Sequence, residues 1–363
     1  MKPSSLLKLG VKHTQNAFWE NVYLHTGIDK TRPVAFYALI NQKCNSKCQY
    51  CSFWRLENYD EELCIQEWQN GLSSIKDFVG NFSISFSGGE PLLKKGFIEL
   101  LAWCHANKIQ AGITTNGMLL ANERIAKEVV RTHPFNISFS IDSNRPEIHD
   151  GIRGCKGGLA KAQQGVLNIM KFKKELDIQV PVIIKPTVTS KNFKYLPELV
   201  HWCKEVGVTA VSMQPLFHWT SETYDELWIE EDDILDFKET IQTLIEMKKA
   251  DFPILNSTNN LNLFVDNFQS KKAPKEVLPC LVGLRNFSIR TNGDVRMCSE
   301  FSIIGNIKNQ SSQEIWHNQL ARKERKNTVS CKKLCLMTCT SQKTLLDKFN
   351  IAKKLFNASS PKK

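Results

Sequence analysis

The sequence predicts an α/β protein, a partial (β/α)6 TIM-like barrel followed by a small α+β cysteine-rich domain. Apolar runs alternate with amphipathic helical segments along most of the chain, which is typical of a parallel sheet with right-handed crossovers. Short polar motifs follow several of the apolar runs, at the strand ends where a barrel builds its site. A second group of cysteines comes after a hairpin-forming stretch near the C-terminal end.

The alternation of strands and helices is regular from residue 34 onward. The predicted strands span 34–41, 82–86, 109–114, 136–141, 180–188 and 208–214. The helices predicted between them span 66–78, 96–107, 121–132, 157–176 and 193–206. A doubly wound sheet would place a Gly-x-Gly-x-x-Gly turn after the first strand. A cysteine loop occupies that position here, so the barrel is favoured over the doubly wound sheet.

We expect the chain to consist of five segments. They are an N-terminal helical extension (1–33), the barrel core (34–215), a helical connector (216–275), the cysteine-rich domain (276–342) and a basic tail (343–363). Within the connector, 230–249 reads as a helix whose acidic first turn and basic last turn suit its dipole. The Asn-rich stretch 256–262 is expected to be irregular. In the tail, 343–356 is predicted to form a helix that packs on its own domain.

The loop after the first predicted strand holds three cysteines in the spacing Cys44-x3-Cys48-x2-Cys51. A cubane iron–sulfur cluster needs thiolates that converge from a short loop, and three of them leave one iron open to another ligand. A zinc knuckle is the alternative, but it would need a fourth Cys or His close by, and the sequence offers none before Cys64. We therefore interpret the loop as a cluster-binding loop.

This loop resembles the signature of the radical SAM superfamily, in which the open iron binds S-adenosylmethionine. The resemblance implies that Cys44, Cys48 and Cys51 hold a [4Fe–4S] cluster. The stretch Gly88-Gly89-Glu90 resembles the family motif that holds the amino group of the methionine moiety. Glycines allow close approach of a ligand and a carboxylate accepts from an ammonium group, although the same residues read alone as an ordinary strand-to-helix turn.

The resemblance also implies further contacts with S-adenosylmethionine. They come from Tyr50 near the adenine, Thr115 and Asn116 at a strand end, Ser140 at the ribose and Arg153 at the carboxylate. From the residues alone, Thr115 and Asn116 also read as a helix cap, and Arg153 as a surface residue of a helix-capping loop. Strict alternation places Ser138, Ser140 and Asp142 on one face of their strand, and Asp142 is an alternative contact for the substrate.

The C-terminal cysteines follow a second pattern. The turn 291–294 (Thr-Asn-Gly-Asp) predicts a hairpin joining 287–290 to 295–298, and it returns Cys298 toward the base of that hairpin. A short helix from Ser312 follows, and then the remaining cysteines. This region resembles the auxiliary-cluster domain of the SPASM/Twitch subfamily, which implies one auxiliary iron–sulfur cluster, with zinc as the alternative. The candidate ligands are Cys280, Cys298, Cys331, Cys335 and Cys339, of which Cys280, Cys298 and two of the other three are the expected set.

Composition limits the class of protein. The 363 residues include no apolar run of the ~20 residues that a membrane span needs, and the start of the chain is too short and polar for a signal peptide. We therefore expect a cytoplasmic protein, in which twelve cysteines point to metal ligands more than to disulfides. The net charge of +11 is spread along the chain, so binding of nucleic acid is not favoured.

The predicted function is that of a radical SAM enzyme. The resemblance implies that it cleaves S-adenosylmethionine to a 5′-deoxyadenosyl radical and abstracts hydrogen from a sugar- or aminocyclitol-like small molecule or from a peptide. The auxiliary cluster is then expected to take an electron from the substrate radical, which gives net oxidation, or to anchor the substrate directly. A flavodoxin- or ferredoxin-type reducing system is the implied partner. The alternatives are a ribosomal-peptide or sulfatase-type maturase, an RNA-modifying enzyme, and a non-catalytic iron–sulfur electron carrier or zinc-binding protein.

Overall fold

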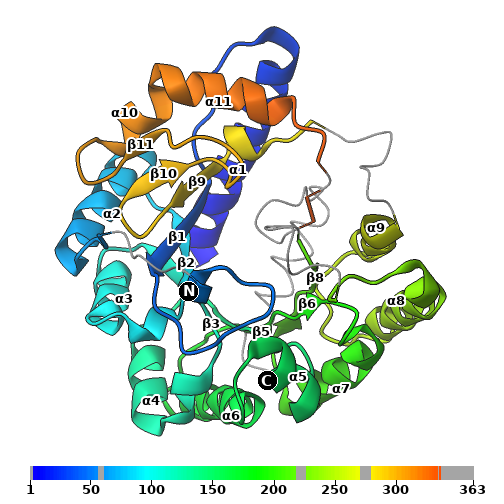
Figure 1. Ribbon diagram of the computed structural model, residues 1–363. Coiled ribbons are helices and arrows are strands. Elements are labelled where there is room, and N and C mark those ends of the chain that lie inside the picture. Colours follow the sequence, from blue (N-terminus) through cyan, green and yellow to red (C-terminus); the bar gives the residue numbers. More distant parts are fainter. Residues whose placement is uncertain (1–2, 56–60, 218–225, 270–278, 334, 337–363) are drawn as a thin grey trace. The chain divides into compact units, whose positions relative to one another are not determined.

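The computed structural model describes residues 3–55, 61–217, 226–269, 279–333 and 335–336. The chain divides into two compact units, each made of separate stretches of sequence. Unit 1 contains 1–43, 56–113 and 278–332, and unit 2 contains 44–55, 114–277 and 333–363. The cysteine-rich stretch up to residue 332 therefore belongs to the same unit as the first strands of the chain (Figure 1).

Unit 1 is built around a mixed sheet whose strands follow the order β11-β10-β9-β1-β2-β3. Their bounds are β1 (Ala35–Asn41), β2 (Ser83–Gly88), β3 (Gln110–Thr115, which crosses into unit 2 after Ile113), β9 (Asn286–Ile289), β10 (Asp294–Arg296) and β11 (Gly305–Asn306). Parallel pairing joins β1 to β2, β2 to β3 and β1 to β9, and antiparallel pairing joins β9 to β10 and β10 to β11. The predicted hairpin thus extends the sheet at β1.

The core of unit 1 is aromatic. Strand β1 alternates half-buried and buried residues, as expected for a strand with one packed face. The ring of Phe36 on this strand lies 4.8 Å from that of Phe82 and 5.9 Å from that of Phe287, so the N-terminal strands and the hairpin share one core. The helices of this unit are α1 (Pro3–Thr26), α2 (Ile65–Val79), α3 (Phe97–Ala106), α10 (Ser312–His317) and α11 (Gln319–Val329).

Unit 2 continues the alternation of strands and helices. Its strands β4 (Ile137–Phe139), β5 (Val182–Ile184) and β7 (Ala210–Val211) are parallel, and β6 (Thr187–Val188) pairs in parallel with β8 (Gln214–Pro215). Figure 1 shows α6 and α7 along β5. The helices of this unit are α4 (Glu123–Arg131), α5 (Pro146–Arg153), α6 (Gly158–Glu175), α7 (Leu196–Val206), α8 (Ile234–Lys249) and α9 (Thr258–Gln269).

The structure departs from the sequence prediction at several elements. The predicted strand 180–188 is divided into β5 and β6, because Pro186 lies between them and cannot donate to a ladder. The prediction that 256–262 is irregular is wrong from Thr258 onward, where α9 begins. Leu261, Phe264 and Phe268 form a buried stripe at helical spacing, and their burial outweighs the low helix propensity of the asparagines. Helices α5 and α11 were not predicted, and the predicted tail helix 343–356 lies outside the described residues.

Candidate active site

The cysteine loop of unit 2 is fastened to the C-terminal end of α5. The backbone N–H of Lys47 donates to the carbonyl of Arg153 (3.0 Å), and the N–H of Gln49 donates to the carbonyl of Ile152 (2.9 Å). The last carbonyls of a helix have no partner within it, so these bonds satisfy groups that the helix leaves free. Gly154 ends the helix at φ +61°, and a Cβ there would lie 2.4 Å from the Lys47 carbonyl oxygen. Close packing of backbone on backbone therefore fixes the loop.

The three thiols of this loop differ in exposure. Cys48 is buried, while Cys44 and Cys51 are half-buried. Burial raises the pKa of the Cys48 thiol to about 12, the Arg153 guanidinium acts in the opposite direction, and the neighbouring thiols raise the pKa further. Burial also raises the pKa of Cys51. A metal that binds these sulfurs as thiolates must displace the protons, and Arg153 is the group that favours the anionic sulfur at Cys48.

The assignment of these thiols to a cluster stays a prediction from their spacing. Among the residues that the structure describes, no three His, Cys, Asp or Glu side chains converge as the ligands of a single metal ion would. In a cubane cluster each thiolate binds a different iron, so the cluster accepts thiols that stand farther apart. The indole N–H of Trp54 donates to the Cys48 carbonyl (2.9 Å), which steadies the loop next to the buried thiol.

The Gly88-Gly89-Glu90 turn ends β2 in unit 1. Its backbone is hydrogen-bonded to the residues that precede the cysteine loop in the sequence. The N–H of Gly89 donates to the Asn41 carbonyl and the N–H of Glu90 donates to the Lys43 carbonyl, both at 2.8 Å. A Cβ on Gly89 would lie 2.1 Å from the Lys43 carbonyl oxygen, so only glycine fits this position. Glu90 is buried, and its carboxylate accepts from the N–H of Leu92 at 3.2 Å. Lys43 is the residue that directly precedes Cys44 in the sequence.

The strand ends of unit 2 contribute short polar side chains. Asn116 Nδ2 donates to Asn45 Oδ1 at 2.6 Å, so one predicted site residue contacts the cysteine loop directly. Thr115 is buried, its hydroxyl accepts from the Gly117 N–H (3.0 Å), and its carbonyl accepts from the N–H of Ser140 (2.9 Å). These bonds support the cap-and-turn reading of Thr115 and Asn116, and they also bring Ser140 beside them. The contacts of these three residues with S-adenosylmethionine stay predictions.

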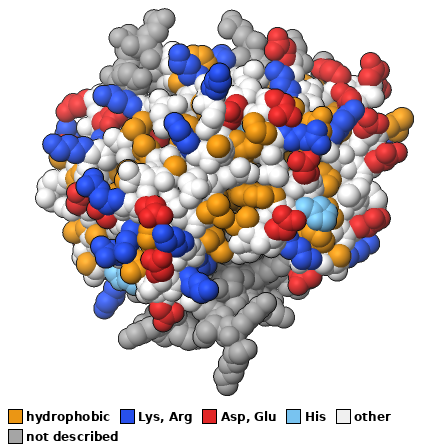
Figure 2. Space-filling model, turned by 90° about the horizontal axis from the view of Figure 1, so that it is seen from below, with side chains coloured by type: hydrophobic (Ala, Val, Ile, Leu, Met, Phe, Trp, Pro, Cys, Tyr) orange, Lys and Arg blue, Asp and Glu red, His pale blue; other side chains and the backbone are white. Residues whose placement is uncertain are grey.

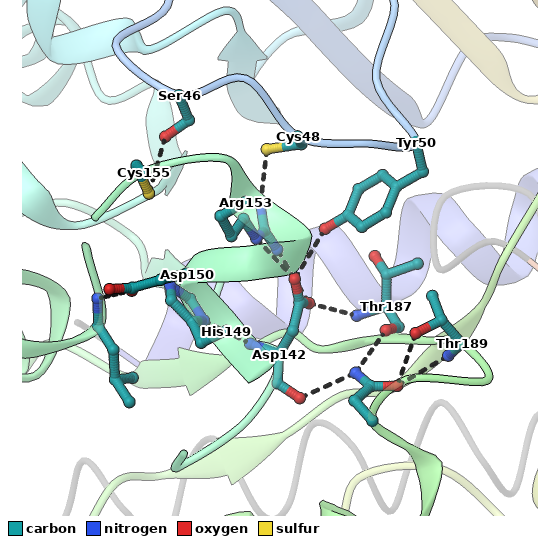
Figure 3. Close-up of polar contacts among 12 residues, drawn as sticks. Ser46, Cys48, Tyr50, Asp142, His149, Asp150, Arg153, Cys155, Thr187 and Thr189 are labelled. Carbon is teal, nitrogen blue, oxygen red and sulfur yellow. Dashed lines mark hydrogen bonds and ion pairs between the residues drawn. The ribbon is translucent and has the colours of Figure 1, made fainter. Parts of the chain in front are cut away.

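Asp142 is the centre of a buried polar network (Figure 3). Arg153 donates to its carboxylate through Nε (2.6 Å) and Nη2 (3.0 Å), the Tyr50 hydroxyl donates at 3.0 Å, and the N–H of Thr187 donates at 2.9 Å. The carboxylate has no solvent exposure, and the Arg153 side chain is only 9% exposed. The remaining Nη1 of Arg153 lies 3.8 Å from the Cys48 sulfur, at the range of an N–H···S hydrogen bond.

Three members of this network were not predicted from the sequence: His149, Thr187 and Asn192. His149 Nδ1 accepts from the Asp142 N–H at 3.1 Å, and burial lowers the pKa of His149 to about 4, so the ring is neutral. Asn192 donates to the Asp142 carbonyl (2.8 Å) and to the Thr187 carbonyl (2.9 Å). The available signal was the shared face of Ser138, Ser140 and Asp142, which marked a polar strand end but not its partners. The carboxylate of Asp142 accepts from Arg153, Tyr50 and Thr187, and its alternative role as a substrate contact stays a prediction.

Three of the candidate auxiliary ligands lie in unit 1. Cys280, Cys298 and Cys331 are half-buried, and the pKa of the Cys280 thiol is raised by burial and by the thiols of Cys298 and Cys331. The thiols of Cys298 and Cys331 are therefore near enough to Cys280 to act on its charge. Cys335 belongs to unit 2, and Cys339 lies outside the described residues. Cys280, Cys298 and two of Cys331, Cys335 and Cys339 stay the predicted ligands of the auxiliary cluster.

Two family models match the chain. That of the Radical SAM superfamily matches residues 39–171, and that of the SPASM family, an iron–sulfur cluster-binding domain, matches residues 280–340. The two ranges contain the two groups of cysteines described above.

Curated relatives and solved structures agree with these matches. An AdoMet-dependent heme synthase of Oleidesulfovibrio alaskensis is 25% identical over 76% of this chain and 72% of its own length. A PqqA peptide cyclase of Rhodopseudomonas palustris is 28% identical over 46% of this chain and 43% of its own length. The structure of Streptococcus suis SuiB bound to its precursor peptide SuiA is 19% identical, with a TM-score of 0.63 over 85% of this chain and 70% of that one. This likeness shows the fold, a partial (β/α) barrel with a cysteine-rich domain.

The surface and helices add two observations. Within the described residues, no helix is both long and apolar enough to cross a membrane. On the face drawn in Figure 2, Lys and Arg side chains are interspersed with Asp and Glu side chains. On that face the net positive charge does not form the continuous basic stripe that nucleic-acid-binding proteins use.

Proposed function

The chain belongs to the radical SAM superfamily and carries a SPASM-type cluster-binding domain, and we propose that it abstracts hydrogen from a peptide. It is an enzyme that works with a [4Fe–4S] cluster, S-adenosylmethionine and an auxiliary iron–sulfur cluster. When reduced, the first cluster supplies the electron that divides S-adenosylmethionine into methionine and a 5′-deoxyadenosyl radical. The protein supplies binding, orientation and a water-excluding pocket for this chemistry.

The observation that carries the proposal is the fastening of the cysteine loop to α5. Cys44, Cys48 and Cys51 are assigned as the ligands of the first cluster. Backbone bonds from Lys47 and Gln49 hold the loop against the end of α5. Three thiolates for the four irons of a cubane cluster would leave one iron free for S-adenosylmethionine.

We assign the contacts with S-adenosylmethionine to the strand ends. The Gly88-Gly89-Glu90 turn receives the methionine amino group, because it combines a close backbone with a buried carboxylate. Asn116 and Ser140 border the nucleoside together with Thr115 and Tyr50. Arg153 has given Nε and Nη2 to Asp142, so a contact with the methionine carboxylate uses its remaining N–H groups.

The auxiliary cluster is assigned to Cys280, Cys298, Cys331 and one of Cys335 and Cys339. Once hydrogen has moved from the substrate to the 5′-deoxyadenosyl radical, the substrate radical holds one electron more than the oxidised product. A cluster held by these cysteines would supply an acceptor for that electron, and release of a proton would complete a net oxidation. A flavodoxin- or ferredoxin-type protein then supplies reducing equivalents, and we place the enzyme in the cytoplasm, where such donors operate.

A peptide substrate is supported by the names of several relatives. The PqqA peptide cyclase is one, a sporulation killing factor maturation protein of Bacillus subtilis is another, and SuiB is seen with its precursor peptide. A small-molecule substrate is the second candidate, because the match to the heme synthase extends over 76% of this chain, compared with 46% for the peptide cyclase. The RNA-modifying alternative draws no support from these relatives, and a non-catalytic role disagrees with membership of an enzyme family.

Anaerobic reconstitution tests the enzymatic proposal. With dithionite and S-adenosylmethionine, the wild type is expected to form 5′-deoxyadenosine, and the triple variant Cys44→Ala/Cys48→Ala/Cys51→Ala is expected to form none. The triple variant should keep the iron and sulfide of the auxiliary cluster. Absence of 5′-deoxyadenosine from a wild type with intact clusters would refute the proposal. Loss of all iron from the triple variant would show that the protein holds no auxiliary cluster, and that part of the proposal would fail.

Deuterium transfer tests the substrate. Peptides encoded by short reading frames beside the gene are prepared with deuterated side chains, and 5′-deoxyadenosine is then analysed by mass spectrometry. Deuterium from a peptide supports the first candidate, whereas deuterium only from a labelled small molecule supports the second.

A further inference from the structure

The Arg153 side chain lies between a carboxylate and a cluster thiol. Its Nε and Nη2 form a two-point contact with Asp142, at 2.6 and 3.0 Å, and its Nη1 lies 3.8 Å from the Cys48 sulfur (Figure 3). The guanidinium is rigid and planar, so a fork held at two points also fixes the direction of the third nitrogen. The position of Asp142 therefore determines where the positive charge of Arg153 lies relative to Cys48.

Asp142 is held more firmly than an ordinary ion-pair partner. Its carboxylate also accepts from Tyr50 and Thr187, and its backbone bonds to His149 and Asn192. The groups that hold it come from the cysteine loop, α5, β6 and the turn after β6. Because so many donors fix the Asp142 carboxylate, its position does not depend on Arg153. Asp142 therefore positions the arginine, and not the reverse.

Charge and hydrogen bonding at a cluster sulfur change the reduction potential of the cluster. A reduced cluster carries one more negative charge than an oxidised one, and a buried cation beside a ligand sulfur stabilises that added charge. Solvent screens this effect little, because Cys48, Asp142 and Arg153 are all buried.

We infer that Arg153 raises the reduction potential of the cluster bound at Cys48, and that Asp142 fixes the direction of the guanidinium while its negative charge offsets part of this effect. The inference rests on the proposed function, because it takes Cys48 as a cluster ligand. It differs from a contact between Arg153 and S-adenosylmethionine, because it acts on the cluster before S-adenosylmethionine binds.

Substitution of Arg153 and substitution of Asp142 are expected to shift the reduction potential in opposite directions. Arg153→Gln removes the cation and leaves the Asp142 carboxylate as the nearest charge, so the reduced cluster is disfavoured and the potential falls. Asp142→Asn keeps an amide oxygen that accepts from Arg153 but removes the negative charge beside it, so the potential rises. Each variant is expected to change the equilibrium constant for one-electron reduction at least tenfold, which corresponds to about 59 mV. A residue that only supports the fold would give no such opposition of sign.

The measurement is a redox titration of the reconstituted full-length protein without S-adenosylmethionine, followed by electron paramagnetic resonance. The signal of the first cluster is identified as the one absent from the Cys44→Ala/Cys48→Ala/Cys51→Ala variant. Arg145→Gln is the matched control, since it removes an exposed arginine that pairs with Glu198 at the surface. The potential of that control is expected to equal that of the wild type.

Every outcome decides between the alternatives. Shifts of the same sign in Arg153→Gln and Asp142→Asn, or potentials equal to the wild type in both, overturn the inference. If Asp142→Asn fails to hold a cluster, Tyr50→Phe replaces it. This variant removes one donor from Asp142 and must lower the potential, and an unchanged or higher value overturns the inference. If no signal is lost in the triple cysteine variant, the assignment of the cluster to the loop fails instead.

Discussion

Gly89→Ala is expected to damage the site through the backbone that leads to the first cluster ligand. A methyl group at this position would lie 2.1 Å from the Lys43 carbonyl oxygen and 2.7 Å from the Gln42 carbonyl oxygen. Real Cβ atoms stay beyond 3.0 Å, so the backbone before Cys44 must move by at least 0.9 Å. Overpacking of this kind costs about 1–3 kcal/mol of folding stability, and a displacement of ~1 Å at a reacting group can cost about a hundredfold in rate.

The assay is the rate at which the reconstituted variant forms 5′-deoxyadenosine from S-adenosylmethionine, with iron content and urea unfolding measured on the same sample. Gly151→Ala is the matched control, because no atom lies within 4 Å of a Cβ at this exposed position in α5. The control should keep full activity and gain up to about 1 kcal/mol from the better helix propensity of alanine. A Gly89→Ala enzyme that keeps its iron and cleaves within threefold of the wild-type rate would refute this reasoning.

The remaining predictions concern stability. Burial lowers the folded-state pKa of His149 to about 4, below its unfolded value, so His149 contributes stability above about pH 6.5 that is lost as the pH falls toward 4. Between pH 7 and pH 5 the loss is about 2 kcal/mol, and urea midpoints of His149→Gln should vary less over this range than those of the wild type. Asn256→Ala removes bonds to the N–H and the carbonyl of Met213 and should cost about 2–4 kcal/mol, measured by urea unfolding. Asn259→Ala, at an exposed position in the first turn of α9, should cost far less, and equal losses in the two variants would contradict this account.

The regular parts of the fold could be predicted because their signals are local. Alternating burial along 35–41, the Thr-Asn-Gly-Asp turn at 291–294 and the helical periodicity of 65–79 each depend on neighbouring residues. The prediction failed where tertiary contacts decided the outcome. Residues 258–269 have a poor intrinsic propensity for a helix, and they form α9 because one face is buried.

In the candidate site, too, features that depend on neighbouring residues could be predicted, and features that depend on tertiary contacts could not. The spacing of Cys44, Cys48 and Cys51 predicts a cluster by itself, because ligands in one loop need no knowledge of the fold. The partners of Asp142 could not be predicted in this way, since Tyr50 precedes it by 92 residues and Thr187 follows it by 45. A polar strand end identifies a place where partners are needed, and only the packing of the other elements supplies them.

The cysteine loop is attached to α5 in two physically different ways, and this separation matters for its chemistry. The backbone bonds from Lys47 and Gln49 to the end of the helix do not depend on side chains, so they survive substitutions in the polar network. The network of Asp142, Arg153 and Tyr50 depends entirely on side chains and reaches the sulfur of Cys48. Because different bonds position the loop and control the charge beside it, substitution in the network can change the potential of the cluster without releasing the loop that binds it.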